Sequence, residues 1–254
     1  MPTRMNLLRV LAALLLFSIS FAFVESAVVL YLRAIYEPMH QRLYPDRGPT
    51  DLFPIIRPDQ LEAAGPEHLR QLATELAREA ATLVMLAAAG LAVAANSRQW
   101  VAAFAFAFGV WDICYYAFLK VLLDWPESLA TRDLLFLLPL PWVGPVWSPV
   151  LVSIAMIIAG VLVLWREAIG VPVQFAWPQV TMILGGGSIV ITAFCWDWRN
   201  IAVGGEPNAF HWPLFAAGLV IGASAFGHAI WKTSRPGGFA DSRAMSRRPV
   251  TAFV

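Results

Sequence analysis

Residues 7–32 read LLRVLAALLLFSISFAFVESAVVLYL, an apolar run in which Arg9 and Glu25 are the only charged side chains. The apolar core of a secretory signal is about 7–15 residues long, whereas a helix that crosses a bilayer needs about 20. The run is too long for a signal core, and it continues past Glu25 as Ser-Ala-Val-Val-Leu. It therefore predicts an uncleaved transmembrane helix.

The composition of the whole chain agrees with this prediction. Its 254 residues are 59% hydrophobic and 14% charged, and the mean hydropathy is +0.64. Soluble domains average about 45–50% apolar and about 25% charged residues, so this chain has too few polar side chains to cover a soluble globule. The chain also contains 11 Trp, a residue that concentrates where membrane meets water.

Five further apolar segments extend the pattern to six helices. We expect them at about 7–32, 70–95, 99–123, 146–165, 178–195 and 213–231. Residues 102–108 alternate Ala and Phe as a strand would, but a lone strand cannot satisfy its backbone in lipid, so a helix is favoured. The predicted fold class is an all-α, polytopic integral membrane protein. Residues 1–233 would form one transmembrane domain with a six-helix bundle, and 234–254 a disordered basic cytoplasmic tail.

Two Pro-rich segments interrupt the helices. The first, 36–66, contains Pro38, Pro45, Pro54 and Pro58 and is predicted to be an extracytoplasmic loop, because Pro lacks a backbone donor and disfavours helix. The second, near 133–149, predicts a broken or re-entrant segment. Such backbone is tolerated at membrane depth only where protein or a water-filled cavity satisfies its polar groups.

The distribution of charge predicts the orientation. With six helices, one side carries nine basic and two acidic residues, and the other carries nine basic and fifteen acidic residues. The first set comprises Arg4, Arg9, Arg98, Arg166, Lys232, Arg235, Arg243, Arg247 and Arg248, with Glu167 and Asp241. Short cytoplasmic loops are enriched in Lys and Arg, so we expect a cell-membrane protein with both termini in the cytoplasm.

Four ionisable residues fall in the parts of the predicted helices that would lie within the bilayer, and they are candidate functional residues: Glu25, Glu79, Asp112 and Lys120. Such residues cost about 2.5–3.5 kcal/mol at a helix centre, so they are expected to face the protein interior or a cavity. From the rise per residue, Asp112 lies roughly 16 Å below the outer surface, near the midplane, and Glu25 roughly 10 Å below it. The set descends from the outer side, which predicts a polar cavity open to that side.

Specific partners can be proposed for these groups. Lys120 is at similar depth to Glu79 and is its expected cation, whereas Arg78 points away from the leucine stripe of its helix. Tyr116 lies four residues after Asp112, where its hydroxyl is within hydrogen-bonding reach. Glu25 has no cation within a turn of its own helix. The alternative is that these are ordinary buried contacts between helices.

No motif indicates a catalytic residue, a cofactor or a metal site. The two cysteines lie in apolar runs without a second Cys or His at ligand spacing, and nothing suggests binding of nucleic acid. The expected partners are the lipid bilayer and, through the small-residue face of Gly218 and Gly222, other membrane subunits or a second copy of the chain.

Three functions remain open from the sequence. The first is a transport or ion/proton-translocation protein whose outward cavity is lined by Glu25, Glu79, Asp112, Tyr116 and Lys120. The second is a non-catalytic subunit or accessory protein of a larger membrane complex. The third is a membrane enzyme acting on a lipophilic substrate. The absence of any reaction motif makes an enzyme the least favoured of these.

Overall fold

The computed structural model describes residues 6–48 and 51–234, and within them six helices are long and apolar enough to cross a membrane. They are α1 (Leu7–Leu43), α3 (Pro66–Val93), α4 (Ser97–Leu123), α5 (Trp147–Ala168), α6 (Trp177–Cys195) and α8 (Trp212–Ser234). Two short helices lie between them, α2 (Pro58–Ala64) and α7 (Trp198–Ala202). The predicted all-α membrane bundle is confirmed. Apart from Ser234, which ends α8, the predicted tail 234–254 lies outside the described residues.

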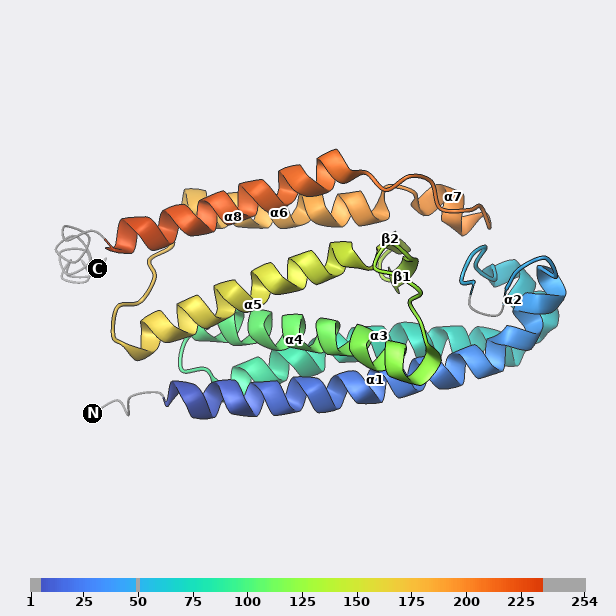
Figure 1. The fold of residues 1–254 in the computed structure, drawn as a ribbon, viewed down its shortest axis with the longest axis horizontal. Helices are drawn as coiled ribbons and strands as arrows, with labels where there is room; N and C mark the ends of the chain where they lie inside the picture. Colours follow the sequence, from blue (N-terminus) through green and yellow to red (C-terminus); the bar gives the residue numbers. More distant parts are fainter. Residues whose placement is uncertain (1–5, 49–50, 235–254) are drawn as a thin grey trace, which may run out of the picture.

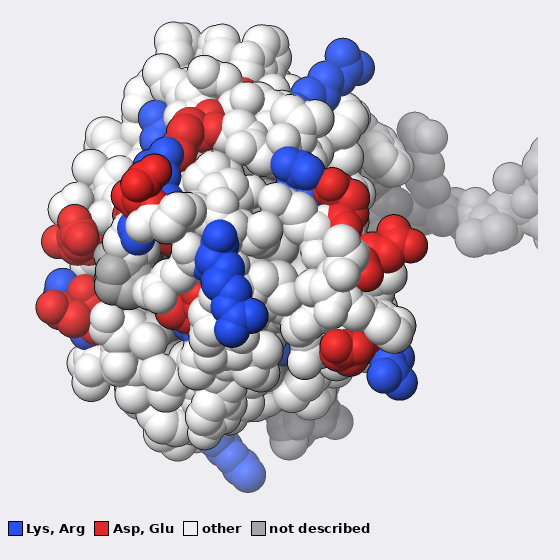
Figure 2. Space-filling view, turned by 90° about the vertical axis from the view of Figure 1, so that its right-hand side faces the viewer, with Lys and Arg blue, Asp and Glu red and all other residues white. Residues whose placement is uncertain are grey.

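The long helices run side by side along one axis (Figure 1). The start of α1 and the end of α8 lie at the same end of the bundle, which we call the terminal end (Figure 1). The opposite end, the hairpin end, carries α2, α7 and the strands β1 (Arg132–Phe136) and β2 (Trp142–Pro145). Viewed onto the hairpin end, acidic and basic side chains are interspersed over the surface (Figure 2).

The break predicted near 133–149 is a β-hairpin, a form that the sequence did not indicate. Strands β1 and β2 are antiparallel, with Asp133 opposite Gly144 and an irregularity between Leu134 and Phe136. The amide of Val146 donates to the carbonyl of Thr131 at 3.0 Å, which continues the pairing into the start of α5. The hairpin thus satisfies its own backbone where a helix is interrupted by Pro.

The predicted loop 36–66 is wrong at both of its ends, since α1 continues to Leu43 with Pro38 inside it and α2 begins at Pro58. Tertiary contacts hold the last turns of α1. Tyr36 donates to the side chain of Gln71 on α3 at 3.2 Å, and a ring nitrogen of His40 lies 3.0 Å from the Pro54 carbonyl. These contacts offset the backbone hydrogen bond that Pro38, which is exposed and lacks an N–H, cannot donate.

Tryptophans bracket three of the spanning helices. The pairs are Trp147 and Trp165 in α5, Trp177 and Trp196 at the two ends of α6, and Trp212 and Trp231 in α8. In each pair the residues are about 27–29 Å apart along the helix, close to the ~30 Å thickness of the hydrocarbon core. Because Trp favours the interface, we take the level of Trp147, Trp196 and Trp212 as the membrane boundary at the hairpin end. Helices α1 and α3 extend past this level (Figure 1).

Glycines allow the closest helix contacts. A Cβ built on Gly160 of α5 would lie 2.6 Å from the backbone oxygen of Ala102, and one on Gly186 of α6 would lie 2.6 Å from the backbone oxygen of Gly218. Gly218 is therefore used within the chain, between α6 and α8, while a Cβ on Gly222 would meet nothing within 4 Å. Of the two residues expected to contact another subunit, Gly218 packs inside the protomer instead.

Replacing Gly160 by Ala is expected to lower the stability of the protein. The added methyl group meets backbone of α4, which cannot rotate away, and overpacking of this kind costs about 1–3 kcal/mol. The melting temperature in detergent measures the effect. The matched control is Gly187→Ala, where the added Cβ meets nothing within 4 Å and the higher helix propensity of Ala should leave the melting temperature unchanged or raise it. Equal melting temperatures for the two variants would contradict the packing argument.

Candidate functional site

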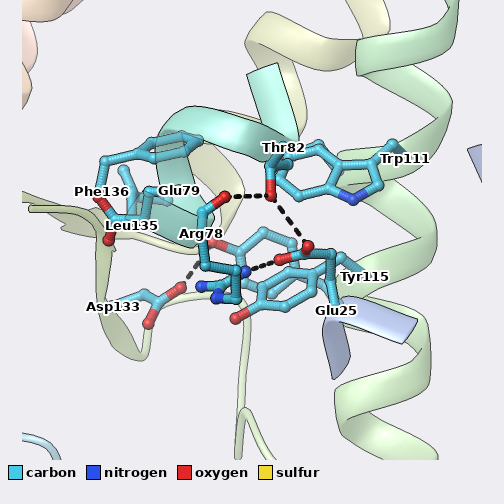
Figure 3. A pocket seen from close by; sticks show the side chains of 11 residues that line it. Glu25, Arg78, Glu79, Thr82, Trp111, Tyr115, Asp133, Leu135 and Phe136 are labelled. Carbon is cyan, nitrogen blue, oxygen red and sulfur yellow. Dashed lines mark hydrogen bonds and ion pairs between the residues drawn. The ribbon is translucent and has the colours of Figure 1, made fainter. Parts of the chain in front are cut away.

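A cavity of about 30 Å³ lies among α1, α3, α4 and the hairpin, and most of the predicted polar residues meet there (Figure 3). Four lining residues are buried acids, each less than a tenth exposed: Glu25, Glu79, Asp112 and Asp133. The remaining lining residues are Arg78, Thr82, Trp111, Tyr115, Tyr116, Leu135 and Phe136. The structure thus brings Glu25, Glu79, Asp112 and Tyr116 together, but not Lys120.

Glu25 is paired with a cation that comes from another helix and not from its own. The Arg78 guanidinium on α3 forms an ion pair with Glu25 on α1 and a second one with Glu75, to which its Nε donates at 2.9 Å. The Thr82 hydroxyl donates to the other Glu25 oxygen at 2.9 Å (Figure 3). Glu25 therefore has a neutralising partner and a hydrogen-bond donor from one face of α3.

Glu79 has no lysine partner, and the predicted Glu79–Lys120 pair is wrong. Its carboxylate accepts from the backbone amide of Leu137 at 2.9 and 3.1 Å and from that of Leu138 at 3.3 Å. These two amides lie in the turn between β1 and β2. Glu79 therefore fixes the tip of the hairpin to α3.

Lys120 lies away from the cavity and is half exposed. Its ammonium group is 2.7 Å from Asp124 and donates to the backbone oxygens of Asp124 and Pro126 at 3.2 and 3.1 Å. The hydrogen bond from Lys120 lowers the pKa of the exposed Asp124 carboxyl. Lys120 thus caps the end of its own helix, where the negative end of the dipole favours a cation.

The expected contact between Asp112 and Tyr116 is also replaced by others. The Tyr116 hydroxyl donates to Asp133 on β1 at 2.8 Å, and Asp112 accepts from the Ser153 hydroxyl on α5 at 2.8 Å. The two acids and their partners connect α4 to β1 and to α5. Asp133 was not predicted as a site residue, because it begins the Pro-rich segment 133–149 and lies in no predicted helix.

Arg78 was also missed, for a physical reason. The leucine stripe of α3 was taken to mark the packing face, yet Leu83 in that stripe is 40% exposed. In lipid an apolar face can point outward without cost, so it does not mark the protein interior as it does in water. The buried face of α3 contains Glu79, Thr82, Leu86 and Gly90. The polar residues Glu79 and Thr82, one turn apart, were the feature of the sequence that could have identified this face.

The depth of the site differs from the sequence estimate. Asp112 contacts Ser153, which lies within the first two turns of α5, about 9 Å along the helix from Trp147. The estimate of about 16 Å took Leu123 as the membrane boundary, but α4 extends beyond the level that the tryptophans mark. Asp112 therefore lies in the half of the hydrocarbon core nearer the hairpin end, shallower than the estimate of about 16 Å placed it.

Packed apolar side chains separate the cavity from the terminal end. Leu14 on α1, Leu86 on α3, and Ala103, Phe106 and Ala107 on α4 belong to one buried cluster, in which no residue is more than a tenth exposed. We call these five residues the apolar seal. It lies on the terminal side of Glu25, Thr82 and Asp112 along each of these helices.

A second hollow, of about 210 Å³, lies at the hairpin end. Arg47, Arg132, Glu206 and Trp125 are among the residues that line it, and Arg47 and Glu206 form an ion pair. The Trp125 ring lies 6.5 Å from that of Tyr116, which lines the buried cavity, and the Arg33 guanidinium lies 4.5 Å above the Trp125 ring. Trp125 and Tyr116 therefore separate the hollow from the cavity.

The loop beside this hollow is fixed by Asp197. Burial opposes ionisation of this carboxyl, but hydrogen bonds from Asn208 and Asn200 outweigh burial and lower its pKa. The backbone and side-chain nitrogens of Asn208 both donate to Asp197 at 2.7 Å. This arrangement holds the chain between α7 and α8 in place.

Within residues 6–48 and 51–234, no group of three or more His, Cys, Asp or Glu side chains could hold a metal ion. The cluster around the cavity is thus a set of carboxylates held mainly by hydrogen bonds and arginines. Comparison with models of known families, with curated proteins and with solved structures found no match to this chain.

Proposed function

We propose that this integral membrane protein translocates protons or a proton-coupled ion and takes up protons at the carboxylate cluster around the buried cavity. One observation carries the proposal, the excess of acid over base in this cluster. The carboxylates are Glu25, Glu79, Asp112 and Asp133 in the cavity lining, with Glu75 beside them, whereas the nearby cations are Arg78, which pairs with both Glu25 and Glu75, and Arg33, which interacts electrostatically with Asp133.

The imbalance has a chemical consequence. Neighbouring carboxylates in a desolvated place cannot all be ionised, because like charges raise the free energy of the fully ionised state and burial raises it further. Such a set shares protons as a group and not residue by residue. A cluster with more carboxylates than guanidiniums is therefore suited to accept and release protons.

Access from the hairpin end is supported by two features. The apolar seal lies between the cluster and the terminal end, and the 210 Å³ hollow approaches the cluster from the hairpin end. The charge distribution of the sequence predicts that the hairpin end faces outward. We propose that the structure corresponds to a state closed toward the cytoplasm, and that translocation requires the seal to open.

The membrane enzyme and the accessory subunit are less well supported, although one observation favours the accessory subunit. A cavity of about 30 Å³ is far smaller than the roughly 300–1,000 Å³ of typical ligand pockets, so a lipophilic substrate has no place there. The apolar seal would also suit a non-translocating subunit whose buried charges only hold helices together.

Proton flux into vesicles tests the proposal. Purified protein reconstituted into liposomes with a pH-sensitive dye inside should collapse an imposed proton gradient faster than protein-free liposomes. Asp133→Asn should abolish the difference, because it removes the acid that is hydrogen-bonded to Tyr116, the residue between the hollow and the cavity, while Asp59→Asn, at an exposed ion pair on α2, should leave it unchanged. Melting temperatures of both variants report folding. Wild-type vesicles that leak no faster than protein-free ones would refute translocation and favour the subunit alternative.

A further inference from the structure

The indole N–H of Trp111 is a buried donor, and the Trp111 side chain lines the cavity. Trp111 is 6% exposed and lines the cavity beside Thr82 and Glu25 (Figure 3), and its Nε1 has no hydrogen-bond partner among the residues that the structure describes. A buried donor without a partner is unfavourable, because the N–H has lost the hydrogen bond that it makes to water. A group inside the cavity would remove this cost.

The chemistry of the lining selects that group. Trp111 can only donate, so the guest must accept a hydrogen bond, whereas the surrounding carboxylates mostly accept, so the guest must also donate. A metal cation would be repelled by the N–H, and an anion by the carboxylates. Water both donates and accepts, and a cavity needs about 10–15 Å³ of such volume to hold one molecule. The 30 Å³ available is enough for one or two.

We infer that the cavity binds one or two ordered water molecules, anchored by the Trp111 N–H and donating to the carboxylates of Glu25 and Asp112. Each of these acids accepts a hydroxyl hydrogen bond at 2.8–2.9 Å, Glu25 from Thr82 and Asp112 from Ser153. A carboxylate offers about four lone-pair sites, so both retain capacity for a water.

The bound water would connect pairs that the protein leaves separate. Glu25 with Thr82, Asp112 with Ser153, and Asp133 with Tyr116 are three hydrogen-bonded groups around one cavity. Water donating to Glu25 and Asp112 makes a continuous path along which a proton passes between these two acids. This relay role rests on the proposed function, whereas the binding of water does not.

Infrared difference spectra of the purified protein, recorded across a pH change in ordinary water and in H₂¹⁸O, test the binding of water. A held water gives an O–H stretching band that shifts with the isotope. The band should be present in the wild type, lost in Trp111→Phe, and kept in Trp142→Phe. Trp142 is the matched control, because its Nε1 is also buried and unpartnered among the described residues but does not line the cavity.

A structure of the wild-type protein at about 2 Å resolution provides a measurement that needs no variant. A water peak at about 2.7–3.2 Å from Trp111 Nε1 is expected. A cavity without such a peak, or an isotope-sensitive band that persists in Trp111→Phe, would overturn the inference. Neither result bears on whether the wild type conducts protons.

The relay is tested separately in the vesicle assay. Trp111→Phe should lower proton flux about tenfold, the scale set by one lost hydrogen bond in the path, while Trp142→Phe should conduct as the wild type does. Full flux in Trp111→Phe, together with loss of the water band, would refute the relay and leave the proposed translocation intact.

Discussion

Arg78→Gln will destabilise the protein by about 3–5 kcal/mol, the cost of leaving a buried charge without its partner. Arg78 is the cation that joins Glu25 on α1 to Glu75 on α3, and Glu25 is only 4% exposed. Thermal unfolding in detergent micelles measures the loss. Arg70→Gln, an exposed change on the same helix, is the control and should alter stability little.

A double variant separates the charge effect from a loss of packing. Adding Glu25→Gln to Arg78→Gln removes the orphaned carboxylate, so the double variant should be more stable than Arg78→Gln alone. An Arg78→Gln variant no less stable than Arg70→Gln would show that the pair does not hold α1 to α3. A double variant less stable than Arg78→Gln would indicate that the Arg78 side chain contributes through packing.

Trp125→Ala should cost a similar amount, about 3–5 kcal/mol, because a large buried ring is lost and leaves a cavity. Trp125 is 2% exposed and packs against Tyr116, Leu119 and Val146 in one cluster. It also accepts the Arg33 guanidinium over its face, a contact worth about 0.5–2 kcal/mol that Ala cannot make.

The melting temperature again provides the measurement, and position 177 provides the control. Trp177 is 80% exposed, so Trp177→Ala should change stability by about 0.5 kcal/mol or less. Trp125→Phe should fall between the wild type and Trp125→Ala. Similar melting temperatures for the variants at 125 and 177 would refute the view that the packed Trp125 ring between the hollow and the cavity stabilises the protein.

The helices could be predicted from the sequence because length and hydropathy act locally. A run such as 7–32 must be helical in lipid whatever packs beside it, since no other backbone form satisfies itself there. The boundaries of the other five helices were likewise predicted to within about one turn. The end of α1 was missed, because the contacts of Tyr36 and His40 come from residues that are remote in the sequence.

The partners of the charged residues could not be predicted in the same way. Depth along a helix suggested Lys120 for Glu79, but depth does not determine which face of a helix meets which neighbour. Glu79 accepts hydrogen bonds from two amides at the tip of a β-hairpin, and no sequence pattern predicted that hairpin. Arg78 was assigned to the wrong side because the apolar stripe of α3 partly faces outward. Burial cost alone predicted that Glu25, Glu79 and Asp112 face the protein interior or a cavity, without knowledge of their partners.

The matched spacing of the tryptophans in α5, α6 and α8 bears on which membranes suit the protein. Three helices with the same apolar length set one preferred bilayer thickness, and departures from it cost fractions of a kcal/mol per ångström through tilting or local deformation of the lipid. In a much thicker bilayer the hairpin end, including Asp133 and the strands beside it, would be drawn into the hydrocarbon core. Hydrophobic matching therefore couples lipid chain length to the hydration of the carboxylate cluster, and short-chain and long-chain lipids should not support it equally.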